Sequence, residues 1–298
     1  MGAVCPLYPR DGKTPRFKSY ISSGHILSRI IAQRKKSGAR PRVISLGYIH
    51  EPKEGSSQSQ YTPKWAAEEL LKPFYDAGGR HFLVEFLPYD PPGKISQVAK
   101  ELELLKKNNY IIDPQTMPIL DKYLYKSSRD SYISFLKKAE QLGIAVYGVN
   151  LTLEEWDKEN QGGDWKTDKT KIKRVQSLIT ERTLAREKEL TQQKKGVVLI
   201  GTLNGLIRND IVPLKEDLHR NHGQALAKKY GRGYLEVDLV LPSLVPEAEK
   251  DTGPYWFWNN YHGVQPQASE TQKRCFATQD SPRKASHYVI IYPKASQR

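Results

Sequence analysis

Four short apolar segments constrain the fold of this 298-residue chain more than any other feature. They cover residues 43–46, 81–86, 144–149 and 197–200. A parallel strand is covered on both faces and therefore has a nearly continuous apolar sequence. Segments in which apolar residues recur at helical spacing lie between these four. We therefore predict an α/β fold with a mostly parallel central sheet and helices on both faces.

The remaining segments complete this alternation of strands and helices. Helices are predicted at residues 23–37, 62–74, 98–107, 130–142, 170–194 and 222–230, and further strands at 233–241 and 287–292. Ser23 is the predicted cap of the first helix. Residues 1–15 should form an N-terminal arm, 156–168 an exposed loop, and 242–285 an aromatic-rich insertion or lid. A single domain over residues 1–298 is the simplest organisation.

The charge of the chain favours anionic partners. Lys and Arg number 47 against 33 Asp and Glu, which gives a formal net charge of +14. An anionic membrane or another polyanion is therefore a possible partner. Specific nucleic-acid recognition is not expected, because the basic residues are spread along helical faces with acidic residues among them. The sequence contains no transmembrane segment, so we expect a cytoplasmic protein or one secreted without a classical signal peptide.

Polar residues stand where the apolar strands are predicted to end. Gly47 lets the chain turn after the first strand, which places His50 and Glu51 just beyond it. Ligands of open α/β sheets bind at the carboxyl ends of the strands. The predicted site residues are His50, Glu51, Glu85, Asn150, Asn204 and, from the long helix, Arg182.

These residue types suit hydrolytic chemistry. His50 and Glu85 could bind a divalent metal (Mn, Co or Zn), which would lower the pKa of a bound water to about 7. Glu51 could act as a base or as a partner of His50, and Arg182 could stabilise negative charge on a reacting oxygen. Structural roles are the alternative: His50 bonded to backbone, Glu85 paired with Arg182, and a turn at Asn204.

In element order and motifs, residues 40–292 resemble one superfamily. It contains erythromycin esterases, Tiki and TraB proteins, ChaN-like haem-uptake proteins and a domain of bacterial mitogenic toxins. The positions that carry the resemblance are Gly47 to His50, Glu85, Glu181-Arg182 and Gly201 to Asn204. The chain departs from this pattern at Tyr48, where esterase-like members have Glu, and at Asn204, where a second His is expected.

The resemblance implies a hydrolase that acts on an ester or amide bond of a small molecule or peptide. Two alternatives use the same scaffold. Asn204 and the aromatic insertion fit a protein that binds a ligand without turnover, either haem held by Tyr261 and His262 or another anionic ligand. The net charge fits an effector-like or toxin-like interaction protein at an anionic surface.

Overall fold

The computed structural model has an α/β fold, as predicted. It describes residues 18–20, 22–48, 61–91, 97–124, 128–160, 169–193, 198–205, 222–240, 275–279 and 286–291. The chain divides into two compact units. Unit 1 comprises Met1–Ser59, Gly205–His219 and Gly223–Arg298, and unit 2 comprises Gln60–Asn204 and Arg220–His222. The single domain expected from the sequence stays a prediction.

Unit 1 contains a mixed set of strands. They are β1 (Lys18–Tyr20), β2 (Val43–Tyr48), β6 (Tyr234–Val240), β7 (Cys275–Gln279) and β8 (Ser286–Ile291), in the order β1-β7-β8-β6-β2. The strands β2, β6 and β8 are parallel, whereas β7 runs antiparallel to both β8 and β1. The antiparallel pairs involve β7 at one side of this order. The parallel arrangement that the sequence predicts is present in β8, β6 and β2.

The helices of unit 1 follow the predicted apolar spacing. Helix α1 (Ser23–Lys36) buries Ile26, Leu27, Ile30 and Ile31. Its N-cap is Ser22, whose side chain accepts a hydrogen bond from the backbone of His25, so the predicted cap at Ser23 is wrong by one residue. Helix α9 (His222–Tyr230) begins at His222, which belongs to unit 2, and its remaining residues in unit 1 lead through the 3-10 turn η3 (Gly231–Gly233) into β6.

Unit 2 has three parallel strands in the order β5-β3-β4. They are β3 (Gly79–Pro88), β4 (Ala145–Asn150) and β5 (Leu199–Gly205). Gly78 and Gly143 precede β3 and β4 with φ of 104° and 68°, so glycine makes the sharp turns from helix to strand. The sequence predicts all three strands.

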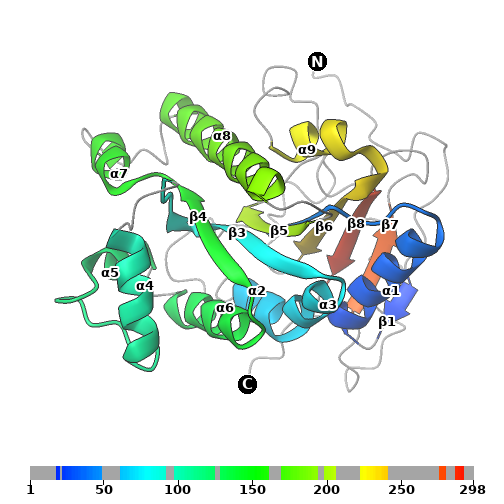
Figure 1. Cartoon of the computed structure of the whole chain (residues 1–298), viewed down its shortest axis with the longest axis horizontal. Coiled ribbons are helices and arrows are strands. Elements are labelled where there is room, and N and C mark those ends of the chain that lie inside the picture. The colour runs from blue at the N-terminus through cyan, green and yellow to red at the C-terminus, as the bar shows by residue number, and fades with distance from the viewer. Residues whose placement is uncertain are drawn as a thin grey trace, which may run out of the picture. The chain divides into compact units, whose positions relative to one another are not determined.

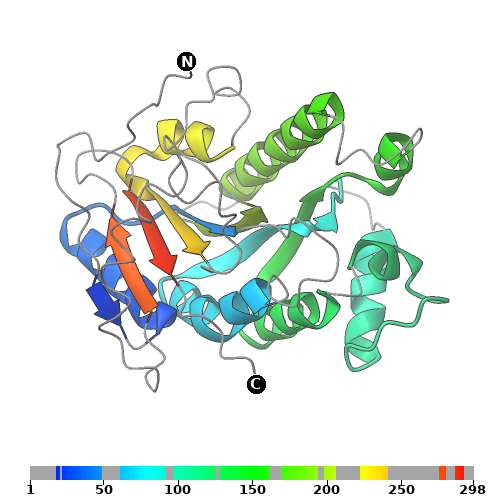
Figure 2. The same ribbon diagram turned by 180° about the vertical axis from the view of Figure 1, so that it is seen from behind.

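Helices cover both faces of the unit 2 strands (Figures 1 and 2). On one face Leu83 packs with Leu190 of α8 (Lys169–Gln193). On the other face Phe82 packs edge-on against Phe74 of α3 (Leu71–Asp76) and Phe135 of α6 (Arg129–Gln141). Side chains of adjacent strand residues point to opposite faces, which explains why both faces are apolar. The remaining helices are α2 (Tyr61–Trp65), the π-helical turn η1 (Ala66–Leu70), α4 (Gln97–Lys107), α5 (Pro118–Tyr123) and α7 (Leu153–Asn160).

Several elements were not predicted. Residues 156–160 belong to α7 rather than to a loop, because Thr152 and Glu155 form a reciprocal cap at its start. Helix α5 begins at Pro118, a residue that favours the first turn of a helix as well as a loop. Strand β7 lies inside the predicted insertion, and β1 is a three-residue strand that pairs only with β7. Across the described residues, no helix is both long enough and apolar enough to cross a bilayer.

Candidate functional site

Three predicted site residues lie together at the carboxyl ends of β3 and β4 in unit 2. Glu85 belongs to the last part of β3, Asn150 is the final residue of β4, and Arg182 lies on α8. Val84 pairs with Leu203 of β5, so the backbone of Asn204 follows at the level of Glu85. Parallel strands end at a common edge, which is why residues distant in sequence meet here.

Asn150 connects the two strand ends through hydrogen bonds. Its Nδ2 donates to the carbonyl oxygen of Glu85 at 2.7 Å, and its Oδ1 accepts from the backbone N–H of Leu151 at 2.7 Å. The carbonyl oxygen of Asn150 accepts from the backbone N–H of Tyr89 at 3.0 Å and from Nη1 of Arg182 at 2.6 Å. Asn150 therefore fixes the backbone on which Glu85 is carried.

Arg182 is held between this strand end and helix α7. Its Nη2 donates to both carboxylate oxygens of Glu155 at 2.5 Å, and its guanidinium carbon lies 4.8 Å from the ring centre of Tyr89. Burial pushes the pKa of Glu155 upward, but hydrogen bonds from Arg182 and Thr152 outweigh it and hold the pKa below its usual value. In the structure Arg182 forms its ion pair with Glu155, and its predicted role toward a reacting oxygen stays a prediction.

A second arginine extends the same polar layer along α8. Arg186 is buried; its Nη1 donates to Glu189 at 2.7 Å and its Nη2 donates to the carbonyl oxygen of Asp90. Its guanidinium carbon lies 5.7 Å from the ring centre of Tyr89 and 5.2 Å from that of Tyr147. Burial raises the pKa of Tyr147. Both guanidinium groups therefore lie near the Tyr89 ring, close enough for cation–π interactions.

The chemically most distinctive pair is Glu85 and His222, whose side chains interact electrostatically. His222 is 6% exposed, and the carboxylate of Glu85 acts on its imidazole electrostatically. Burial lowers the pKa of His222 to about 4, and the negative charge of Glu85 opposes that shift without cancelling it. The imidazole is therefore neutral at pH 7 and presents one nitrogen that donates and one that accepts. The sequence did not single out His222, because nothing in residues 206–221 marks its approach to β3.

The other predicted site residues are not placed. His50, Glu51, Tyr261 and His262 lie outside the described residues, as does the side chain of Asn204. The predicted metal site combined His50 with Glu85. In the part of the chain that the structure describes, no group of three or more His, Cys, Asp or Glu side chains is placed to hold a metal ion. The described residues alone do not fit a metal, and the haem interpretation falls on residues that are not described.

Strand β6 of unit 1 carries three buried polar side chains at alternate positions, Tyr234, Glu236 and Asp238. The alternation of polar and apolar residues predicts the strand but not the burial of the polar ones. Tyr234 and Glu236 are fully buried, and Asp238 nearly so. The Tyr234 hydroxyl donates to Glu236 at 2.8 Å, and burial, reinforced by that carboxylate, raises the pKa of Tyr234 well above its usual value. Asp238 pairs in register with Gly47, the first residue of the predicted Gly-x-x-His motif. Of these three side chains, that of Asp238 therefore lies on the strand beside the start of that motif.

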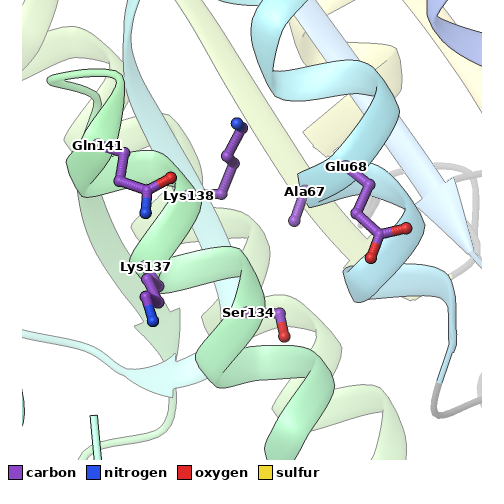
Figure 3. Close-up of a pocket in the computed structure, with 6 residues that line it drawn as sticks. All are labelled: Ala67, Glu68, Ser134, Lys137, Lys138 and Gln141. Atoms are coloured by element: carbon purple, nitrogen blue, oxygen red, sulfur yellow. The ribbon is translucent and has the colours of Figure 1, made fainter. Parts of the chain in front are cut away.

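Unit 2 has a shallow groove of about 290 Å³ between η1 and α6 (Figure 3). It is lined by Ala67, Glu68, Ser134, Lys137, Lys138 and Gln141. Most of its lining is polar or charged and faces solvent, and Glu85, Asn150 and Arg182 are not part of it. We place the candidate site at the strand ends, where the buried polar contacts are, rather than in this groove.

Two solved structures are similar to this chain in fold. One is the type III effector HopBA1, with 13% sequence identity and a TM-score of 0.42 over 81% of this chain and 96% of that one. The other is a protein from Bacillus cereus, with 11% identity and a TM-score of 0.43 over 91% of this chain and 94% of that one. At these TM-scores the likeness carries no argument about function. No protein-family model and no curated protein matches the chain.

Proposed function

We propose that the chain is a hydrolase of an ester or amide bond in which Glu85 and His222 move the proton. The observation that carries this proposal is a buried histidine, neutral at pH 7, that interacts electrostatically with a carboxylate near the carboxyl end of a parallel strand. Such a position is where α/β folds bind ligands. The resemblance to the erythromycin esterase and Tiki superfamily supports the same reaction class, and it too places a Glu at position 85.

The chemistry follows from the protonation states. A neutral imidazole can accept a proton from water as that water attacks a carbonyl carbon, and it can then return the proton to the leaving group. The carboxylate of Glu85 stabilises the imidazolium that exists between these two steps, because its negative charge favours the protonated form. Burial keeps the imidazole unprotonated at rest, so the acceptor nitrogen is present throughout the neutral pH range.

Arg182 acts in this proposal as a positioning residue. It binds the carbonyl oxygen of Asn150, and Asn150 in turn binds the carbonyl oxygen of Glu85. The segment that carries Glu85 is thereby held to β4 and α8. The proposed proton transfers use only side chains of the protein. Binding of Mn, Co or Zn through Glu85 and His50 is a separate prediction.

The test compares variants in a panel of ester and amide substrates, with and without added Mn²⁺, Co²⁺ or Zn²⁺. We expect Glu85→Gln and His222→Asn each to lower kcat by about 100-fold or more, the usual contribution of a proton-transfer group. The double variant should lose little more than the worse single variant, because the two groups act as a unit. Glu154→Gln, which changes an exposed carboxylate on α7, is the matched control and should retain full activity.

Two outcomes would overturn the proposal. One is full turnover by Glu85→Gln or His222→Asn when circular dichroism shows the wild-type fold. The other is the absence of turnover by the wild-type chain across the panel. The non-catalytic alternatives, a ligand-binding protein or an effector-like interaction protein, stay predictions that the second outcome would favour.

A further inference from the structure

The connection between α4 and α5 in unit 2 exposes large apolar side chains. Among the described residues, Leu104 is 40% exposed and Ile111 is 66% exposed, and both belong to the end of α4 or the loop that follows it. Figures 1 and 2 show this loop projecting beyond the two helices. Leu104 lies on α4 and Ile111 on the projecting loop, and burial of such side chains against an apolar surface is favourable.

The backbone of this loop is strained at one residue. Helix α4 ends in a Schellman cap, in which the N–H of Asn109 donates to Lys106 and the N–H of Tyr110 donates to Leu105. Asn109, at φ 50°, fits the left-handed position that such a cap requires. Tyr110 is also left-handed, at φ 65°, and this conformation costs a bulky residue about 1–2 kcal/mol.

Contacts to α6 and within the loop keep this conformation in place. The Tyr110 hydroxyl donates to Glu140, and the Lys137 ammonium lies 5.8 Å from the Tyr110 ring centre. The backbone N–H of Ile111 donates to the carbonyl oxygen of Asn108 at 3.0 Å, and Nδ2 of Asn108 donates to the carbonyl oxygen of Ile111 at 2.7 Å. Both backbone polar groups of Ile111 are therefore satisfied, so this residue can enter an apolar medium without an unpaired group.

Exposed lysines lie along α4 on both sides of Leu104. Helix α4 exposes three lysines and one glutamate: Lys100, Lys106, Lys107 and Glu103. Glu103 and Glu140 lie 2.5 Å and 3.6 Å from Lys106, and Asp113 in the loop accepts hydrogen bonds from Gln115 and Thr116. Lys100 and Lys107 are four residues before and three residues after Leu104, so they share its face of α4. An aliphatic side chain with a lysine on either side of it matches an anionic lipid surface, where acyl chains lie beneath negative headgroups.

We propose that the α4–α5 connection docks the protein on an anionic lipid bilayer. Ile111 and Leu104 enter the boundary between headgroups and acyl chains, and Lys100 and Lys107 lie against the negative headgroups. A protein partner would need a complementary surface of about 800 Å² on each side. Two exposed aliphatic side chains provide much less than that, whereas a bilayer requires no complementary shape.

The test is sedimentation of the full chain with vesicles of phosphatidylcholine alone or mixed with phosphatidylserine. The wild type should bind the mixed vesicles and not the neutral ones. Replacing both aliphatic residues, in Leu104→Ser with Ile111→Ser, should weaken binding by about tenfold or more, the effect expected when buried aliphatic side chains are lost. Gln115→Ser, a change at an exposed polar residue of the same loop, is the matched control.

Two further variants test the role of charge and the independence of vesicle binding from the proposed hydrolase activity. Lys100→Gln with Lys107→Gln should weaken binding and reduce its sensitivity to salt. Glu85→Gln should bind vesicles as the wild type does, so failure of the hydrolase proposal would leave this one standing. Equal binding to neutral vesicles, unchanged binding of the serine variant, or no binding to either vesicle would overturn the proposal. The last result would point to a protein partner instead.

Discussion

At the scale of single residues, Glu101 shows how a buried carboxyl is accommodated. It lies on α4 with no exposed surface, and its Oε2 accepts a hydrogen bond from the backbone N–H of Leu120 in α5 at 2.9 Å. Burial raises the pKa of Glu101, and the backbone hydrogen bonds from Leu120 and Ile119 oppose the rise only in part. The carboxyl therefore joins the two helices, but burial disfavours its charged form.

This arrangement predicts different outcomes for two substitutions. Glu101→Gln keeps an acceptor for the Leu120 N–H and removes a buried charge, so its free energy of unfolding at pH 7 should equal or exceed that of the wild type. Glu101→Leu leaves that N–H unpaired and should cost about 1–3 kcal/mol. Urea unfolding of both variants at pH 7 measures the difference.

The pH dependence of the Gln variant supplies the check. A carboxyl whose pKa is raised by folding contributes most below its unfolded pKa and loses that contribution as the pH rises through its folded pKa. The advantage of Gln over Glu should therefore shrink as the pH falls toward about 4.3. A Gln variant less stable than the Leu variant would contradict this account.

At the scale of elements, the ion pair between Arg182 and Glu155 joins α8 to α7. The side chains are 11% and 30% exposed, and Glu155 also caps α7 through Thr152. A second pair, Lys122 with Asp157, joins α5 to α7 but is 41% and 61% exposed. The two pairs provide a natural comparison between a partly buried and an exposed ion pair.

We expect Arg182→Met to lower the free energy of unfolding by about 2 kcal/mol, because a charged hydrogen bond is lost while Glu155 stays partly buried. Lys122→Met should cost less than about 1 kcal/mol, as exposed pairs usually do. A double-mutant cycle with Glu155→Gln isolates the coupling. The coupling should weaken as the pH falls through the lowered pKa of Glu155, and equal costs for the lysine and arginine variants would contradict this ranking.

The helices and strands that the sequence predicts are those whose own residues show a strand-length apolar run or a helical spacing of apolar residues. Strands β2 to β5 have apolar runs of strand length, and α1, α6 and α8 have apolar residues at helical spacing. The short β1 has no such signal, because its three residues are ordered by pairing with β7. Glu85, Asn150 and Arg182 could be predicted to meet because parallel strands end at one edge. The interaction of His222 with Glu85 could not, because the sequence between Asn204 and His222 has no periodic pattern that would predict it.

At the scale of the whole molecule, His222 should make stability depend on pH in the acid range. Its pKa falls from an ordinary 6.5 to about 4 on folding, so the unfolded chain takes up a proton that the folded chain excludes. Stability should therefore decrease as the pH falls from about 6.5 to about 4 and then level off. The full effect is about 3 kcal/mol, since one pKa unit corresponds to about 1.36 kcal/mol.

Chemical denaturation at several pH values tests this expectation. Carboxyl groups titrate in the same range, so the relevant quantity is the difference between the wild type and His222→Gln. That difference should change by about 3 kcal/mol between pH 7 and pH 4, with the wild type losing more. Parallel curves for the two proteins would show that His222 does not titrate as its burial implies.

The pairing of β1 with β7 has a consequence for biosynthesis. On the ribosome, Lys18–Tyr20 is translated long before its hydrogen-bonding partner Cys275–Gln279. Residues 60–204, by contrast, leave the exit tunnel as one continuous stretch that holds nearly all of unit 2. Since nascent chains fold in the order in which complete units appear, unit 2 should acquire its structure first. Strand β1 can pair with β7 only after Cys275–Gln279 has been translated.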